Sequence, residues 1–298
     1  MNHPSYQMPN NKPLLLVRGG GDLASGVILR LHRSGLNVIV SELPQPLAVR
    51  RSVSFAEAVY DGTHTIEGVT GRLIEWDLPP GEFERRITAA LEWDEIPVIV
   101  DPQAEVLSRL PFLAIVDARL IKKAVEPLPV HVSLYIGVGP GFHAGEDCDA
   151  VIETRRSHTL GRVYWHGTAQ ADSGQPEGDP KRVLRAVSDG IFVGHKKISE
   201  HCEPGELIAN IESEADNQNT SIVAPLGGML RGLIRDGVRV TKGLKVGDID
   251  PRDDRSACYL VSDKALSIGG GVLEALLSKK EIRDKLWAPS QPPPISPS

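Results

Sequence analysis

The stretch LLLVRGGGDLASGVILRL, residues 14–31, decides the fold that the sequence predicts. Its apolar start, residues 14–18, predicts a buried strand, and residues 22–34 predict a helix that begins at Asp22 and stops at Gly35. A second apolar run, NVIVSE over residues 37–42, follows the helix. Strand, glycine turn, helix and strand in about 30 residues form a βαβ unit, whose strands should be parallel and buried.

The glycines of this stretch match a dinucleotide-binding turn. Gly19, Gly21 and Ala24 fit the spacing GxGxxG/A, in which small residues allow a tight turn and a close approach of backbone to a pyrophosphate. The amides at the start of the helix then face the anion. Glu42 ends the second strand, where a carboxylate accepts a ribose hydroxyl. We therefore expect Gly19, Gly20 and Gly21 to bind a nucleotide phosphate and Glu42 to contact a ribose.

Other features of this region leave alternatives open. A tight structural turn without a ligand is the alternative for the glycines. Asp22 would repel a pyrophosphate unless its side chain turns away as a helix cap. Arg50 and Arg51 could hold a 2′-phosphate, a free phosphate or an acidic ligand, or could be a solvated surface pair.

A second charged cluster lies in IETRRSHTLGRVYWHG, residues 152–167. Mixed charges and imidazoles beside glycines suit an anion pocket or an acid–base site, and a solvated loop is the alternative. We expect four side chains to line the pocket at a domain junction: Glu153, Arg156, His158 and Arg162. His158 and His166 lack a third ligand at the usual spacing, so no metal site is expected.

Composition narrows the class of protein. The 298 residues are 41% hydrophobic and 24% charged, which is typical of a soluble globular chain. The net charge of −6 argues against nucleic-acid binding. Cys148, Cys202 and Cys258 form no CxxC pair and fit a reducing compartment. With no signal peptide and no apolar run of about 20 residues, we expect a cytoplasmic protein without membrane contact.

The pattern of apolar runs and turn residues along the chain predicts two parts, an α/β domain and a β-rich domain. We expect a Rossmann-like parallel-sheet domain over residues 13–126 and a β-rich domain over 127–260. Within the latter, residues 185–250 hold two similar halves and resemble the barrel-sandwich fold of biotinyl and lipoyl carriers. The link over 212–220 has no lysine, so the module is expected to be a scaffold or docking surface. Residues 261–282 predict a helix interrupted by Gly269–Gly271 that could pack on the first domain, and 283–298 a flexible tail.

Several long strings of the sequence together resemble one family. They are RGGGDLASGVILRL, ELPQPLAVRRSVSFAEAVYDG, VDARLIKK, GPGFHAGEDCDAVIETRRSHTLGRVYWHG, APLGGMLRGLIRDGVRVTKGLKVGDIDPR and SDKALSIGGGVLEA. They resemble the YqeB family of accessory proteins associated with selenium-dependent molybdenum hydroxylases, over about residues 14–277. The N-terminal part is also similar to the Rossmann domain of XdhC-type maturation factors.

The resemblance implies a factor for molybdenum hydroxylase maturation that binds NAD(P) or the nucleotide of the molybdenum cofactor. The second cluster would then line a pterin or anion pocket. Expected partners are a molybdenum hydroxylase or its cofactor-biosynthesis proteins. A homodimer is a further possibility. Two alternatives stand beside this function, an NAD(P)-dependent oxidoreductase and a non-catalytic docking chaperone. The resemblance assigns no catalytic residue.

Overall fold

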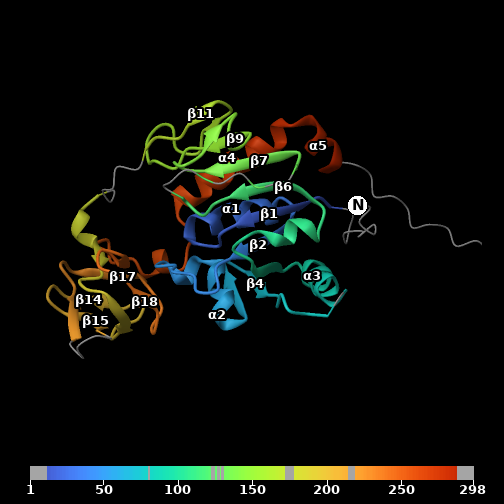
Figure 1. Cartoon of the computed structure of the whole chain (residues 1–298). Helices are drawn as coiled ribbons and strands as arrows, with labels where there is room; N and C mark the ends of the chain where they lie inside the picture. The colour runs from blue at the N-terminus through green and yellow to red at the C-terminus, as the bar shows by residue number, and fades with distance from the viewer. Residues whose placement is uncertain are drawn as a thin grey trace, which may run out of the picture.

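A nine-stranded sheet forms the centre of the computed structural model, which describes residues 12–286 apart from 80, 122–124, 126–127, 129–130, 172–177 and 214–218. Its strand order is β10-β9-β7-β6-β1-β2-β5-β4-β3 (Figure 1). Neighbouring strands are parallel except at the edges, where β10 and β3 pair antiparallel with β9 and β4. The strands are β1 (Leu14–Arg18), β2 (Asn37–Glu42), β3 (Thr63–Ile66), β4 (Val69–Leu73), β5 (Ile96–Val100), β6 (Phe112–Asp117), β7 (Leu134–Val138), β9 (Ala150–Ile152) and β10 (Val163–Tyr164).

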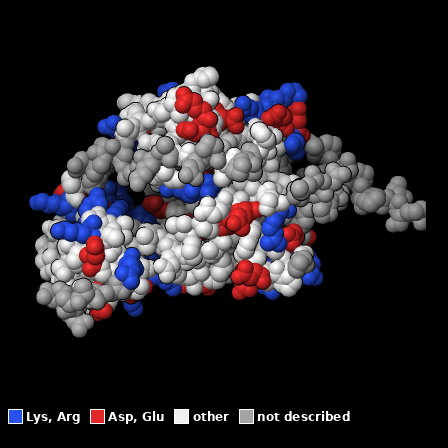
Figure 2. Space-filling model, in the orientation of Figure 1, with Lys and Arg blue, Asp and Glu red and all other residues white. Residues whose placement is uncertain are grey.

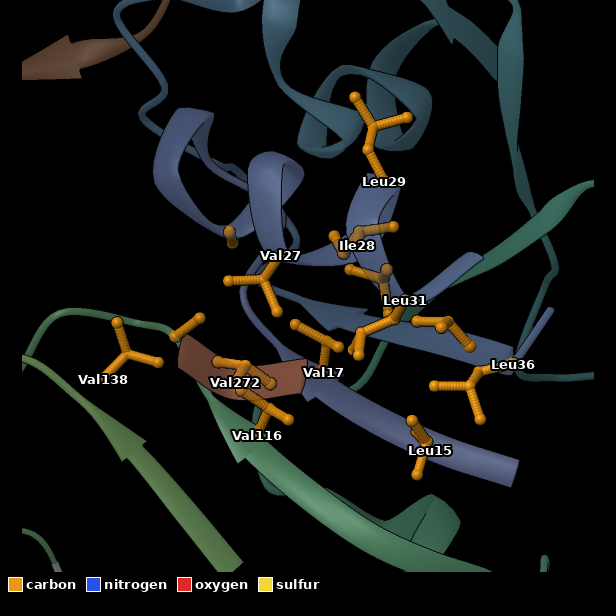
Figure 3. Close-up of a cluster of buried hydrophobic side chains, with 14 of the residues drawn as sticks. Leu15, Val17, Val27, Ile28, Leu29, Leu31, Leu36, Val116, Val138 and Val272 are labelled. Carbon is orange, nitrogen blue, oxygen red and sulfur yellow. The ribbon is translucent and has the colours of Figure 1, made fainter. Parts of the chain in front are cut away.

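Helices cover both faces of this sheet. On one face lie α1 (Asp22–Arg33), α2 (Ala58–Asp61) and α4 (Asp263–Ser278), whose apolar residues share a core with alternate residues of the strands. Figure 3 shows Val27 and Leu31 of α1 packed with Val17 of β1 and Val272 of α4. On the other face, α3 (Glu82–Glu92) packs on a second apolar cluster. Because both faces are covered, every residue of β1 is buried.

Close packing of α4 on α1 and on the turn at Gly161 depends on glycine. A Cβ built on Gly26 would lie 2.5 Å from the backbone of Ala265, and one on Gly271 would lie 2.1 Å from the carbonyl oxygen of Gly161. The expected interruption of this helix is absent, because α4 runs unbroken from Asp263 to Ser278. Its glycines form a flat side on which other backbone rests. The short α5 (Lys280–Leu286) follows.

A second unit lies to one side of the large sheet (Figure 1). It has two four-stranded antiparallel sheets, β12-β19-β17-β14 and β16-β15-β13-β18, which enclose a core of their own. Its strands are β12 (Val183–Arg185), β13 (Gly190–Gly194), β14 (His201–Cys202), β15 (Leu207–Glu212), β16 (Asn219–Val223), β17 (Gly228–Leu233), β18 (Arg239–Val240) and β19 (Lys245–Asp250). The strands β8 (His143–Ala144) and β11 (Gly167–Thr168) form a separate two-stranded sheet.

The second unit is bound to the segment that follows β2. The Leu233 amide donates to the Val49 carbonyl at 2.8 Å, and Arg51 Nε donates to the Leu233 carbonyl at 2.7 Å. Arg50 donates to the carbonyls of Ala257 and Leu260 at 2.9 and 3.0 Å. These bonds fix the position of the unit relative to the sheet.

The expected fold class, a Rossmann-like domain followed by a β-rich domain with a barrel-sandwich module, is wrong. The parallel sheet continues past residue 126, because β7 and β9 extend it beyond β6, and antiparallel edge strands make it mixed. Short strands divided by glycine do not reveal which sheet they join, so the sequence assigned them to the β-rich part. On this half of the sheet, α4 returns from the C-terminal end of the chain to cover the strands.

Two further expectations concern the ends and the membrane. Of the expected tail over 283–298, residues 287–298 lie outside the described residues, and 283–286 belong to α5. Within the described part of the chain, no helix combines the length and the apolar character needed to cross a bilayer.

Candidate anion-binding site

The candidate site lies at the carboxyl ends of β1 and β6. The chain leaves β1 through α1 toward β2 on one side, whereas β6 lies on the other side of β1. In open α/β sheets, such a change of direction opens a crevice where ligands bind. The residues at this point are Arg18 at the end of β1, Asp117 at the end of β6, and the turn from Gly19 to Asp22.

The three glycines of the turn have different surroundings. Gly19 has a φ of 92°, in the left-handed region that favours glycine. A Cβ on Gly20 would lie 2.9 Å from the Ala56 amide, which itself donates to the Gly20 carbonyl. At Gly21, by contrast, no atom lies within 4 Å of the position of a Cβ. Gly19 and Gly20 therefore serve the fold of the turn, and Gly21 faces open space.

Glu42 fills part of this corner with its own carboxylate. Its Oε1 accepts the Gly20 amide at 2.5 Å and its Oε2 accepts the Leu43 amide at 2.8 Å. Burial raises the pKa of this carboxyl, and the two amide bonds oppose that shift. The predicted contact of Glu42 with a ribose stays a prediction, and it would compete with these bonds.

One buried carboxylate holds three donors at the strand ends. Asp117 accepts from Arg18 Nη1 at 3.2 Å, from Arg119 Nε at 2.8 Å and from Tyr135 Oη at 3.2 Å. Burial, with Asp117 beside it, raises the pKa of the Tyr135 hydroxyl, which therefore stays protonated. Arg18 is buried and also donates to the Pro102 carbonyl, but its Nε has no hydrogen-bond partner. Two guanidinium groups thus face one carboxylate.

The second unit presents a larger charged group toward the same region. Asp248, which is fully buried, pairs with Arg182, Arg231 and Lys245. Its neighbour Asp250 pairs with Arg231 at 3.0 Å and with Arg252 at 2.6 Å.

Asp22 connects this charged group to the glycine turn. Its Oδ1 accepts the Leu23 amide at 2.9 Å in the first turn of α1, and its Oδ2 lies 3.8 Å from Arg50 Nη1. The charge of Asp22 raises the pKa of Lys245, and the charge of Arg231 lowers the pKa of Arg50. Only 7% of the Arg50 surface is exposed, and its Nε has no hydrogen-bond partner.

Cationic side chains gather around this junction. Five cationic side chains (Arg50, Arg182, Arg231, Lys245 and Arg252) share three carboxylates (Asp22, Asp248 and Asp250). Figure 2 shows a hollow between the second unit and the large sheet, with Lys and Arg atoms gathered along it. We call these eight side chains, with Gly21, the junction crevice.

The second cluster predicted from the sequence has mostly structural contacts. Glu153 is buried, and its carboxylate accepts the amides of Thr154, Arg155 and Gln170 at 2.8 to 2.9 Å. Exposed Arg156 forms an ion pair with Asp263, the first residue of α4. His158 and Arg162 are exposed, and Arg162 Nε lies 3.4 Å from the His158 carbonyl. A pocket lined by these four residues stays a prediction.

Metal ligands and thiols add no chemistry to the junction crevice. No group of three or more His, Cys, Asp or Glu side chains among the described residues could hold a metal ion. All three cysteines are buried and free, and burial raises the pKa of the Cys148 and Cys202 thiols to about 11. Such thiols are protonated at neutral pH and poorly nucleophilic.

The sequence pattern pointed to Gly21, Asp22 and Arg50 but not to the charged residues at the strand ends or to most of those in the junction crevice. The available signal was a charge that ends an apolar run, as Arg18 ends LLLVR and Asp117 ends FLAIVD. No comparable signal marks Lys245, because its neighbours Arg182 and Arg231 come from other elements of the second unit.

Comparison with known proteins supports one part of the expected identity. No protein-family profile matches the chain. The chain is 43% identical over 281 residues to the uncharacterized protein YqeB of Escherichia coli (strain K12). The aligned region covers 93% of this chain and 49% of that protein. The chain thus spans about half the length of this relative. The identity confirms the expected resemblance to the YqeB family.

Several solved structures are weakly similar to this chain, and none of those named here is described as a YqeB protein. They include the ectoine utilization protein EutE (DoeB) of Ruegeria pomeroyi, at 12% identity and a TM-score of 0.26, over 80% of this chain and 86% of that one. A succinylglutamate desuccinylase/aspartoacylase of Rhodobacter sphaeroides has 12% identity and a TM-score of 0.28, over 80% and 85%. We derive no activity from alignments this weak.

The expected function needs correction at this point. The expected role in molybdenum hydroxylase maturation and the two alternatives attached to it find no counterpart in the solved structures named above, which are an ectoine utilization protein and a succinylglutamate desuccinylase/aspartoacylase. The selenium-dependent and XdhC-like character expected of the chain likewise has no support in the comparison with YqeB, which is uncharacterized.

Proposed function

We propose that the protein binds a small molecule through a phosphate group in the junction crevice. One observation carries the proposal: five cationic side chains gather beside the open side of Gly21. A phosphate dianion would accept charge-assisted hydrogen bonds from such side chains. The two buried guanidinium groups with an unpartnered Nε, on Arg18 and Arg50, flank the same turn and support the proposal.

The Asp22 carboxylate limits where an anion can bind at the glycine turn. This carboxylate already lies in the first turn of α1, where the helix dipole favours negative charge. A phosphate that approaches the turn must therefore bind on the side of Arg50 and Lys245, or displace the Asp22 side chain. The motif GxGxxA predicts that the phosphate belongs to a nucleotide, and NAD(P) or another nucleotide stays a proposal.

Calorimetric titration with inorganic pyrophosphate tests the proposal. We expect saturable binding that weakens as salt is added, because the attraction between exposed charges is screened. Replacing the partly exposed cation in Lys245→Met should lower the affinity about tenfold, as the loss of one charge-assisted bond does. Lys242→Met is the matched control, since Lys242 lies in the exposed turn before β19 and should bind as the wild type does. Parallel titrations with NAD, NADP, CMP and GMP decide whether a nucleoside adds affinity.

Two results would count against the proposal. One is no heat and no rise in melting temperature at millimolar pyrophosphate. The other is binding that Lys245→Met and Lys242→Met weaken equally, which would place the anion elsewhere on the surface.

A further inference from the structure

Lys245 has the weakest pairing of the three cations around Asp248. The Asp248 Oδ1 is taken by Arg182, and Oδ2 accepts Arg231 Nε at 2.8 Å. Lys245 Nζ lies 3.8 Å from Oδ1, beyond hydrogen-bond distance. The short contacts of the Asp248 carboxylate thus go to the two guanidinium groups and not to the ammonium.

The groups around Lys245 come from four elements and act in opposite directions. Burial lowers the pKa of Lys245, and Arg182 and Arg231, which precede β12 and lie on β17, lower it further. Asp248 on β19 and Asp22 on α1 raise it in part, and the net direction is downward. A lysine beside other cations, with part of its surface enclosed, is a recurrent form of activated amine. Its side chain is nevertheless 40% exposed, so a dissolved molecule can reach Nζ.

We propose that Lys245 is the reactive amine of the junction crevice and forms an imine with an aldehyde or ketone group of the phosphate-bearing ligand. This inference rests on the proposed function, because the bound phosphate would hold the carbonyl carbon near Nζ. The neutral amine attacks the carbonyl carbon, and the carbonyl oxygen takes up a proton as nitrogen releases one. The carbinolamine then loses water to give the imine. Amine and carbonyl become imine and water, without oxidation or reduction.

Pyridoxal 5′-phosphate is a suitable probe, because it carries an aldehyde and a phosphate on one small molecule. After brief exposure of the whole chain, borohydride reduction fixes any imine, and peptide mass spectrometry locates it. We expect Lys245 to be modified faster than Lys242, since a lowered pKa raises the neutral fraction of the amine at a given pH. Pyrophosphate should protect Lys245 and leave the modification of Lys242 unchanged.

Variants and pH separate selective chemistry from general labelling. Lys245→Arg should lose the adduct at this position, and Lys242→Arg should keep it. The rate at Lys245 should reach half its maximum at a lower pH than the rate at Lys242. Pyrophosphate binding by the wild type without preferential modification of Lys245 would overturn the inference and leave the proposed function standing. If pyrophosphate neither binds nor protects, the proposed function itself fails.

Discussion

Asp250 shows how strongly single residues of the crevice depend on their partners. Its side chain is 5% exposed, accepts Arg252 Nε at 2.9 Å and Nη2 at 2.6 Å, and pairs with Arg231. The hydrogen bonds from Arg252 lower the pKa of the carboxyl from 3.8 to about 2, although burial opposes them. A carboxylate with a lowered pKa stabilises the fold when it is ionised, so its contribution is complete above its unfolded pKa and declines below it.

Asp250→Asn should therefore destabilise the protein by about 2 kcal/mol at neutral pH, since one pKa unit corresponds to about 1.4 kcal/mol. The difference from the wild type should be constant above about pH 5. Below pH 4 it should narrow, because the unfolded wild type takes up a proton that the folded state binds only near pH 2. Urea unfolding of both proteins between pH 7 and pH 3 measures this. A gap that widens in acid would refute the assignment.

At the scale of the element, α4 combines weak helix propensity with close packing. Its three consecutive glycines cost helical stability, yet the helix is continuous. Gly269 and Gly271 are buried against the backbone of Gly26 and Gly161, whereas Gly270 is exposed with no atom within 4 Å of a Cβ. Only the two buried glycines are therefore required by the close contacts of α4, Gly269 with α1 and Gly271 with the turn at Gly161.

Adjacent substitutions in α4 should have opposite effects. Gly270→Ala should stabilise the protein by about 0.5–1 kcal/mol, because alanine favours the helix and meets nothing there. Gly271→Ala should destabilise it by about 2 kcal/mol or more, since its Cβ would lie 2.1 Å from the Gly161 carbonyl oxygen. Thermal and urea unfolding of the pair measure both changes. Equal shifts in the two variants would show that α4 does not pack in this way.

For the whole molecule, the crevice exists only while the second unit stays docked on the sheet. Besides the bonds to Val49 and Arg51, Arg235 donates to Glu57 at 3.0 Å and to Asp61 at 2.7 Å. Glu57 is 2% exposed, and burial raises the pKa of its carboxyl. A buried carboxylate of this kind needs its cations, so this interface holds the two units in one arrangement.

Arg235→Gln should loosen this docking. It leaves Glu57 with Arg51, 3.6 Å away, and should lower the free energy of unfolding by about 1–3 kcal/mol. Arg185→Gln is the control, because Arg185 donates to the Gly243 carbonyl inside the second unit and should change stability by about 0.5 kcal/mol or less. Calorimetry and limited proteolysis compare the two. Indistinguishable unfolding of both variants would mean that the Arg235 contacts do not hold the units together.

Local patterns determined the first βαβ unit and part of the candidate site. The predicted strand 14–18, the helix from Asp22 and the strand 37–42 are confirmed by β1, α1 and β2, with the helix one residue shorter than expected. Apolar runs, a glycine turn and a helix stop are signals within a few residues of one another, so sequence alone carries them. The same signals drew attention to Gly21 and Asp22, and the arginine pair at residues 50–51 drew attention to Arg50.

Only the tertiary structure decided which sheet the later strands join, how α4 lies on α1, and what surrounds the glycine turn. Arg50 bonds to carbonyls 207 and 210 positions away, and Lys245 approaches Asp22 from the far end of the chain. Such pairs depend on how packed units meet, and the burial that shifts a pKa or leaves a guanidinium nitrogen unpartnered arises only there. The spacing of residues along the sequence therefore predicts neither these pairs nor their burial.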